Sequence, residues 1–144
     1  MINVTYYTIN IDRQIELKQR DLMALIQGIT TMDTYKESQQ ILESYDIQLI
    51  VEAPCEEGIF LPTKVSDSMQ LGKPIFTISP SVGVLNDLYK QGHISYFSSV
   101  QNEKNILSTL RQIYKDFTNG KIKSFSLEKS YSPRTIVQQY NEII

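Results

Sequence analysis

Short apolar runs alternate along this chain with longer stretches in which apolar residues recur at helical spacing. Residues 2–9, INVTYYTI, are rich in β-branched and aromatic types, which favour strands. The run at 47–51, IQLIV, is continuously apolar, a pattern typical of a strand that is covered on both faces. IFTIS at 75–79 and ISYF at 94–97 have the same character. Strands are therefore predicted at all four places.

The stretches between these runs have the spacing of amphipathic helices. Residues 35–45 place Ile41, Leu42 and Tyr45 on one helical face. A helix is predicted over 62–71, with Pro62 at its first helical position and Gly72-Lys73-Pro74 as its stop. Another, over 82–91, is stopped by Gly92. The last two, 103–117 and 133–144, have apolar stripes at Ile106, Leu107, Leu110, Ile113, Tyr114 and Phe117, and at Ile136, Val137, Tyr140, Ile143 and Ile144.

Alternating strands and helices in one chain predict a parallel sheet with helices on both faces. Two segments lie between the first predicted strand and the helix at 35–45: 11–21, a polar stretch that suits a short helix or a loop, and 22–30, a second apolar run closed by a glycine. The length of 144 residues and the 41% hydrophobic content suit one globular unit with a real core. The sequence thus predicts one α/β domain over 1–144.

Charge and composition exclude several classes of function. The net charge of -2, with both signs interspersed, gives no broad basic surface for nucleic acid or an anionic membrane. No apolar run approaches the roughly 18 residues of a membrane span, and no signal peptide begins the chain, which predicts a soluble, cytosolic protein. One cysteine, Cys55, and one histidine, His93, cannot build a disulfide framework or a zinc cluster, and leave a Cys55–His93 dyad as a formal alternative.

The richest chemistry lies in EEGIFLPTKVSDSMQLGKP, Glu56 to Pro74. The segment leaves a predicted strand end and enters a helix, the edge at which parallel sheets bind ligands. Gly58 would let a ligand approach the backbone, and the first amides of the helix would attract an anion. Lys64 is a cation in the first turn, where the helix dipole disfavours it by about 0.3–1 kcal/mol unless an anion compensates. Asp67, one turn on, could accept two hydroxyl hydrogen bonds, as from a ribose.

Plainer interpretations compete with this one. Lys64 and Asp67 could form an ordinary surface ion pair, and the side chains of Ile59, Phe60 and Leu61 favour a place in the core. Glu56 and Glu57 are typical of solvated loop acids, and Cys55 of a small buried hydrophobe. The tyrosines could stack a base but are more typical of core positions: Tyr6, Tyr7, Tyr35 and Tyr45.

The block DIQLIVEAPCEEGIFLPTKVSDSMQLGKPIFTISPSVGVLNDL resembles the nucleotide-sugar-binding half of family-four retaining glycosyltransferases. These enzymes have the two-domain GT-B fold, each half of which is Rossmann-like. The block is most similar to the bacterial branch whose motif reads EGIFLPSK followed by an acid and AGKP-like residues. The resemblance covers about Tyr35 to Phe117.

The resemblance implies roles for individual residues. Glu57 matches the first acid of the family motif and would be the catalytic-site acid that binds hydroxyls of the transferred sugar. The amides around Gly58, Ile59, Phe60 and Leu61 would face the sugar and the diphosphate, with Lys64 near the phosphates. Asp67 matches the second acid, which holds the ribose diol; most relatives have glutamate there, and the aspartate side chain is shorter.

The beginning of the chain departs from the family pattern. Relatives carry an Arg and a Lys after the first strand of this half, and Arg13 and Lys18 have a similar spacing. By length, however, INVTYYTIN matches the second strand, so the first strand and helix are expected to be missing and the pair is not assigned. We therefore expect the donor-binding half of a glycosyltransferase without its N-terminal acceptor-binding domain.

The resemblance implies a retaining, metal-independent transferase without a cofactor that uses a UDP- or GDP-sugar, in bacterial cell-surface polysaccharide synthesis. It would be cytoplasmic, or peripheral at the inner membrane in full-length form, and this chain alone is expected to be inactive. Two alternatives stay open: a sugar-nucleotide epimerase of the same architecture, and a non-catalytic α/β interaction module in which Lys64 and Asp67 are only an ion pair. Sugar, base, acceptor and oligomeric state do not follow from the sequence.

Overall fold

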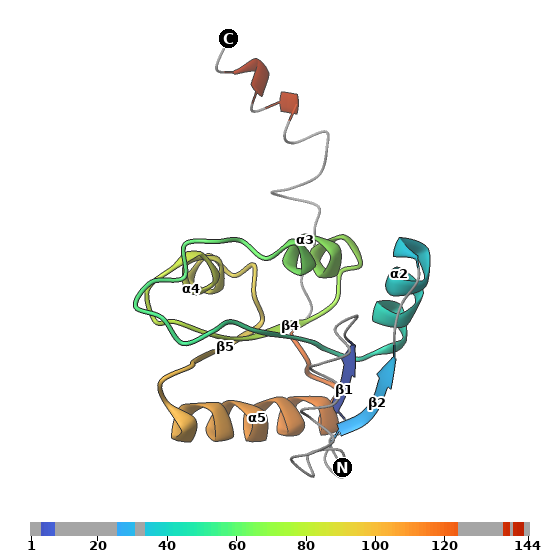
Figure 1. Cartoon of the computed structure of the whole chain (residues 1–144), viewed down its shortest axis with the longest axis vertical. Helices are drawn as coiled ribbons and strands as arrows, with labels where there is room; N and C mark the ends of the chain where they lie inside the picture. Colours follow the sequence, from blue (N-terminus) through green and yellow to red (C-terminus); the bar gives the residue numbers. More distant parts are fainter. Residues whose placement is uncertain (1–3, 8–25, 31–33, 124–136, 139, 143–144) are drawn as a thin grey trace. The chain divides into compact units, whose positions relative to one another are not determined.

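The chain forms two compact units, Met1–Ile41 and Leu42–Ile144. The structure is a computed structural model that describes residues 4–7, 26–30, 34–123, 137–138 and 140–142 (Figure 1). The predicted segment 11–21, with Arg13 and Lys18, lies outside the described residues.

The first unit contains a two-stranded parallel sheet. Strand β1 spans Val4–Tyr7 and pairs with β2, Ile26–Thr30. The strand predicted at 2–9 is confirmed over its described residues. The glycine of the second apolar run does not close it, because β2 continues through Gly28 to Thr30.

Helix α2, Tyr35–Ser44, begins with a reciprocal cap that its sequence encodes. The Glu37 N–H donates to the Thr34 hydroxyl (3.2 Å), and the Thr34 N–H donates to the Glu37 carboxylate (3.1 Å). This capping box satisfies two N–H groups that the helix cannot pair internally. At the other end, the Lys73 ammonium donates to the carbonyls of Glu43 (2.6 Å) and Tyr45 (2.9 Å).

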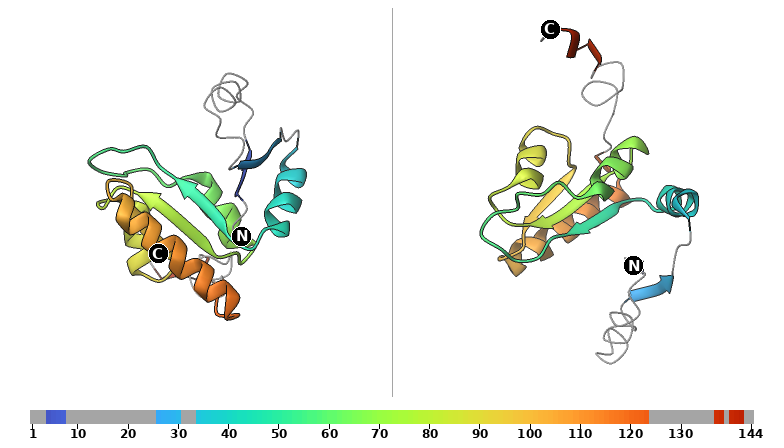
Figure 2. Two further views of the ribbon diagram at one scale, coloured as in Figure 1. Left: turned by 90° about the horizontal axis from the view of Figure 1, so that it is seen from below. Right: turned by 45° about the horizontal axis from the view of Figure 1, so that its top comes forward.

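The second unit is built on a parallel sheet of three strands in the order β3-β4-β5. Strand β3 is Gln48–Val51, β4 is Ile75–Ser79 and β5 is Tyr96–Ser99. Helices pack on both faces of this sheet (Figures 1 and 2). The predicted class, an α/β Rossmann-like domain, is confirmed. Strand β5 begins two residues after the predicted start, although Ile94 and Ser95 are already buried.

One face of the sheet is covered by α3, Thr63–Gln70, and α4, Val84–Lys90. The core between them and the sheet consists of Ile50, Val65, Met69, Ile75, Leu85, Leu88 and Ile94. Both helices end where predicted, because Gly72 and Gly92 take positive φ angles of 63° and 82° that close the last turn. Pro62 is not the first helical residue: its extended ψ of 133° makes it the N-cap.

The opposite face is covered by α5, Glu103–Thr118, the longest helix among the described residues. Asn102 caps it by accepting from the Asn105 N–H (3.0 Å). Its buried contact is Ile113, which packs with Phe76 and Tyr96 of the two strands beneath. The outer positions of the predicted stripe, Leu107, Tyr114 and Phe117, are about half exposed.

Strand β3 corrects the expectation of a strand covered on both faces. Ile50 is buried under the α3–α4 face, but Leu49 is 44% exposed and Val51 is 61% exposed. The reason is that β3 is an edge strand of this sheet and α5 packs over β4 and β5. Of the predicted helix 133–144, the described residues at 137–138 and 140–141 are helical, and the rest lies outside the description.

Candidate functional site

The loop 52–62 leaves the carboxyl end of β3 and is fixed to the loop after β4 through two glycines. The Gly58 N–H donates to the Val82 carbonyl, and the Val84 N–H donates to the Gly58 carbonyl, both at 2.9 Å. Gly58 and Gly83 thereby form a short parallel bridge. Since Val84 is the first residue of α4, the bridge ties the loop to the start of that helix.

A second set of hydrogen bonds joins the same loop to the end of β5. The Gln101 side-chain NH₂ donates to the Cys55 carbonyl (3.1 Å). The Gln101 side-chain oxygen accepts from the Ser99 hydroxyl (2.7 Å), which itself accepts from the Ser81 hydroxyl (2.9 Å). The carboxyl ends of all three strands are therefore linked, and the loop lies where parallel sheets bind ligands.

Beyond Gly58 the loop presents a run of backbone N–H groups without acceptors. Within the described part of the chain, the amides of Ile59, Phe60, Leu61, Thr63 and Lys64 donate to no residue. Pro62 has no N–H, and the next amide, of Val65, donates to the Pro62 carbonyl (3.0 Å). The run ends in the first turn of α3, where the helix dipole adds positive potential. Free amides that lead into a helix N-terminus suit an anion such as phosphate.

The structure brings the predicted site residues together on this loop and helix. Glu57 and Lys64 are exposed, Gly58 is buried, and Asp67 is half-buried on α3. Glu57 is exposed, as the plainer interpretation of a solvated loop acid expects, and it is two residues before the first free amide, that of Ile59. All these residues lie within one loop and the first two turns of α3, so one extended ligand could reach them.

Two expectations about side chains at this edge are wrong. Ile59, Phe60 and Leu61 are not in the core: their side chains are 65%, 76% and 49% exposed. Cys55 is not buried either. Its thiol contacts the Glu57 carbonyl at 3.3 Å.

Two of the alternative interpretations, an ion pair of Lys64 with Asp67 and a dyad of Cys55 with His93, require contacts that are not formed among the described residues. Lys64 makes no ion pair with any described residue, so the surface pair of Lys64 with Asp67 is not formed. The Cys55–His93 dyad is not formed, because Cys55 follows the carboxyl end of β3 whereas His93 precedes β5 at the opposite edge of the sheet. Tyr45 also precedes β3 and is remote from the Gly58 loop.

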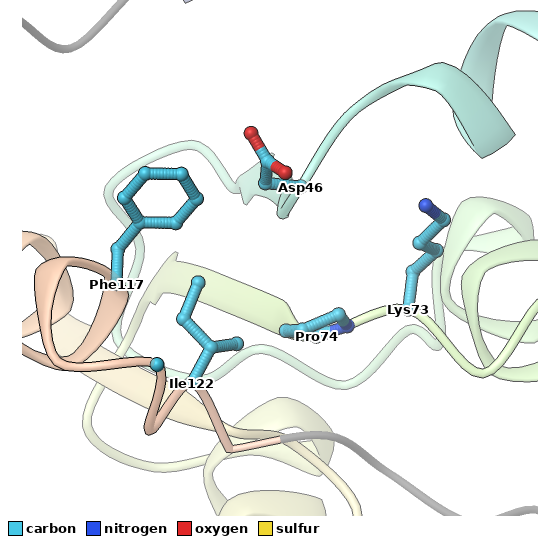
Figure 3. Close-up of a pocket in the computed structure, with 6 residues that line it drawn as sticks. Asp46, Lys73, Pro74, Phe117 and Ile122 are labelled. Atoms are coloured by element: carbon cyan, nitrogen blue, oxygen red, sulfur yellow. The ribbon is translucent and has the colours of Figure 1, made fainter.

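A hollow of about 350 Å³ lies at the amino-terminal ends of the strands, opposite the end that carries the Gly58 loop (Figure 3). It is lined by Asp46, Lys73, Pro74, Phe117, Gly120 and Ile122. Its one cation, Lys73, already donates to the two carbonyls at the end of α2. None of the residues that line the hollow belongs to the Gly58 loop, so the two sites are separate. Because Lys73 is already bound, the lining has no free cation that could bind an anion.

Four residues at this loop were missed in the sequence. Gly83 bridges to it and Gln101 hydrogen-bonds to it, and the Glu52 carboxylate lies beside Gly58 and accepts from the Ser79 hydroxyl (2.6 Å). Gly83 could have been found, because a glycine one residue before a predicted helix suggests a special backbone conformation. The polar residues carry no such signal, since their partners are distant in sequence. Among the described residues no group of three or more His, Cys, Asp or Glu side chains could hold a metal ion.

Comparisons with protein-family models, with curated proteins and with solved structures gave no match. None of the helices in the described ranges is long and apolar enough to cross a membrane.

Proposed function

We propose that this protein binds a nucleotide-diphospho-sugar at the Gly58 loop, as the donor-binding half of a retaining glycosyltransferase. The observation that carries the proposal is the run of unpaired amides from Ile59 to Lys64, which leads into the first turn of α3. A diphosphate is the ligand group that such a run fits best. The resemblance of the EEGIFLPTKVSDSMQLGKP segment to family-four glycosyltransferases supports the same assignment.

Each residue has a role in this proposal. The amides of Ile59, Phe60 and Leu61 bind the diphosphate, and Lys64 neutralises it from the first turn of α3. Glu57 accepts hydrogen bonds from the sugar hydroxyls, and Asp67 accepts them from the ribose diol. During transfer the leaving diphosphate gains negative charge, so the fixed amides and Lys64 would stabilise the transition state more than the bound donor.

A second candidate, a non-catalytic interaction module, is favoured by one observation. Ile59, Phe60 and Leu61 are three consecutive large apolar side chains that are half exposed or more, and exposed apolar patches often mark protein contacts. In the glycosyltransferase proposal the same side chains would face the acceptor-binding domain. Nucleotide binding separates the two candidates.

The experiment is an amide NMR titration of the 144-residue chain with UDP and with GDP. We expect the shifts to cluster at Glu57 to Asp67 and to leave the hollow at Asp46 and Phe117 unchanged, because that hollow lies at the other edge of the sheet. Uridine is the control without a diphosphate and should move the Ile59–Lys64 amides much less. If neither nucleotide at millimolar concentration moves the cluster, the proposed donor site is wrong.

A further inference from the structure

Glu52 is the first residue beyond β3, and both its backbone and its side chain are bound to β4. Its N–H donates to the Ile78 carbonyl (2.9 Å). Its carboxylate Oε2 accepts from the Ser79 hydroxyl at 2.6 Å. Ser79 is fully buried, whereas Glu52 is half-buried. A short hydrogen bond to a hydroxyl that cannot move fixes the position of the carboxylate.

The carboxylate of Glu52 lies directly against the backbone of Gly58. A Cβ atom added to Gly58 would be 2.9 Å from Glu52 Oε2 and 3.6 Å from Pro80 Cδ. Gly58 does not have a positive φ, so its lack of a side chain provides room rather than conformational freedom. The backbone at Gly58 therefore contacts a carboxylate and a proline ring, in addition to its bridge with Gly83.

We propose that Glu52 and Ser79 are positioning residues that hold Gly58 in place, so that the amides from Ile59 onward face the donor diphosphate. This inference rests on the proposed function and names residues that act through the loop. Prior fixing of the loop lowers the ordering cost of binding, as preorganisation does generally. No contact between Glu52 and the donor is required.

A positioning role and a purely electrostatic role of Glu52 predict opposite changes in UDP affinity when the carboxylate is removed. A carboxylate near a diphosphate site repels the ligand, so on electrostatics alone its removal would tighten binding. If Glu52 holds the loop, Glu52→Ala weakens binding instead. Glu52→Gln keeps an oxygen that accepts from Ser79 and removes the charge. The glutamine variant should therefore bind UDP at least as well as the parent chain.

The experiment measures two quantities on the same variants: the Kd for UDP by NMR, and the hydrogen-exchange rates of the Gly58 and Val84 amides without nucleotide. Glu52→Ala and Ser79→Ala should each raise the Kd about fivefold, the value of one ordinary hydrogen bond, and speed both exchange rates by a similar factor. Glu52→Gln should keep both quantities within about twofold. Glu56→Ala is the matched control, because it removes an exposed acid from the same loop, and it should leave exchange unchanged.

If Glu52→Ala does not fold, Gly58→Ala tests the same contact, because its Cβ displaces the flexible end of Glu52 from Ser79. It should raise the Kd and the Val84 exchange rate as Ser79→Ala does. Unchanged Kd and exchange in these variants would overturn the positioning role while UDP binding by the parent chain upholds the proposed function. A parent chain that binds neither UDP nor GDP overturns the proposed function and with it any positioning toward a donor, whatever the exchange rates show.

Discussion

Gly83 lies so close to Gly58 that a Cβ atom on Gly83 would be 2.4 Å from the Gly58 carbonyl oxygen. The two residues come from loops after different strands, and the contact is between their backbones. Gly83 also has a φ of 144°, a region that residues with side chains rarely adopt. The close approach and the φ angle both exclude a side chain at Gly83. Only a glycine there allows the two hydrogen bonds that tie the Gly58 loop to the start of α4.

Gly83→Ala should therefore be among the costliest glycine substitutions in the second unit. Backbone strain alone costs roughly 1–3 kcal/mol, and the clash adds to it because a backbone oxygen cannot easily move away. Gly92→Ala is the matched control: Gly92 has a φ of 82°, but a Cβ there would meet nothing within 4 Å. The check is urea unfolding of both variants. Equal losses of unfolding free energy would mean that the Gly58–Gly83 contact is loose in solution.

Local features of the sequence were enough to predict most elements of the sheet and its helices. The helix ends at Gly72 and Gly92 follow from the conformational freedom of one residue, and the stripe that buries Ile113 follows from helical spacing. Such signals lie within one element, so they are readable before the fold is known.

Exposure at the candidate site was not predictable in this way. Val51 and Phe60 are apolar, and whether they are covered depends on which elements pack over the edge strand and the loop. The pairing of Glu52 with Ser79 spans 27 residues of sequence, and that of Gln101 with Cys55 spans 46. Side chains that meet across such separations leave no periodic trace, so Glu52, Ser79 and Gln101 were missed. Gly58, Lys64 and Asp67 were predicted from the local pattern of a loop entering a helix, and the resemblance added Glu57.

The raised pKa of Tyr96 leads us to expect that the protein loses stability at alkaline pH. Burial raises the pKa of Tyr96 above its ordinary 10.0; the Lys123 N–H lowers it, and the hydrogen bond to Asp116 with its charge raises it further. Between the unfolded and the folded pKa the native state keeps a proton that the unfolded state has lost. Stability is therefore intact below pH 10 and falls as pH rises through the folded pKa, with a slope of up to about 1.4 kcal/mol per pH unit.

The measurement compares the unfolding free energy of the parent chain and Tyr96→Phe from pH 8 to 11. The variant should lose less stability over the alkaline part of this range, because it has no hydroxyl to deprotonate. Tyr114→Phe, which removes a 47% exposed tyrosine of α5, should follow the parent curve. Parallel curves for Tyr96→Phe and the parent would contradict the raised pKa.

If the proposed donor site is right, substitutions of Lys64 and Asp67 should affect the affinities for UDP and uridine differently. Lys64→Ala should weaken UDP about tenfold and uridine hardly at all, because only UDP offers a charge-assisted contact and solvent screens it in part. Asp67→Ala should weaken both ligands, since both carry the ribose diol. Lys90→Ala is the control: it removes an exposed lysine of α4 that pairs with Asp87 at 3.2 Å. Equal, small effects of Lys64→Ala on both ligands would show that Lys64 does not serve the phosphates.

We predict, finally, that this 144-residue chain binds the donor but does not transfer the sugar by itself. Transfer requires an acceptor hydroxyl held about 3–3.5 Å from the anomeric carbon of the sugar. The described part of the second unit has one three-stranded sheet, and the side chains that follow Gly58 are about half exposed or more, so we expect the acceptor to need a second domain. Water would reach the bound donor, so slow hydrolysis is the most that we expect. The test is to incubate the purified chain with UDP- and GDP-sugars and candidate acceptors and to follow nucleotide release. Sustained, acceptor-dependent release that disappears in Glu57→Ala would show that this chain is sufficient for transfer, and that Glu57 takes part in it.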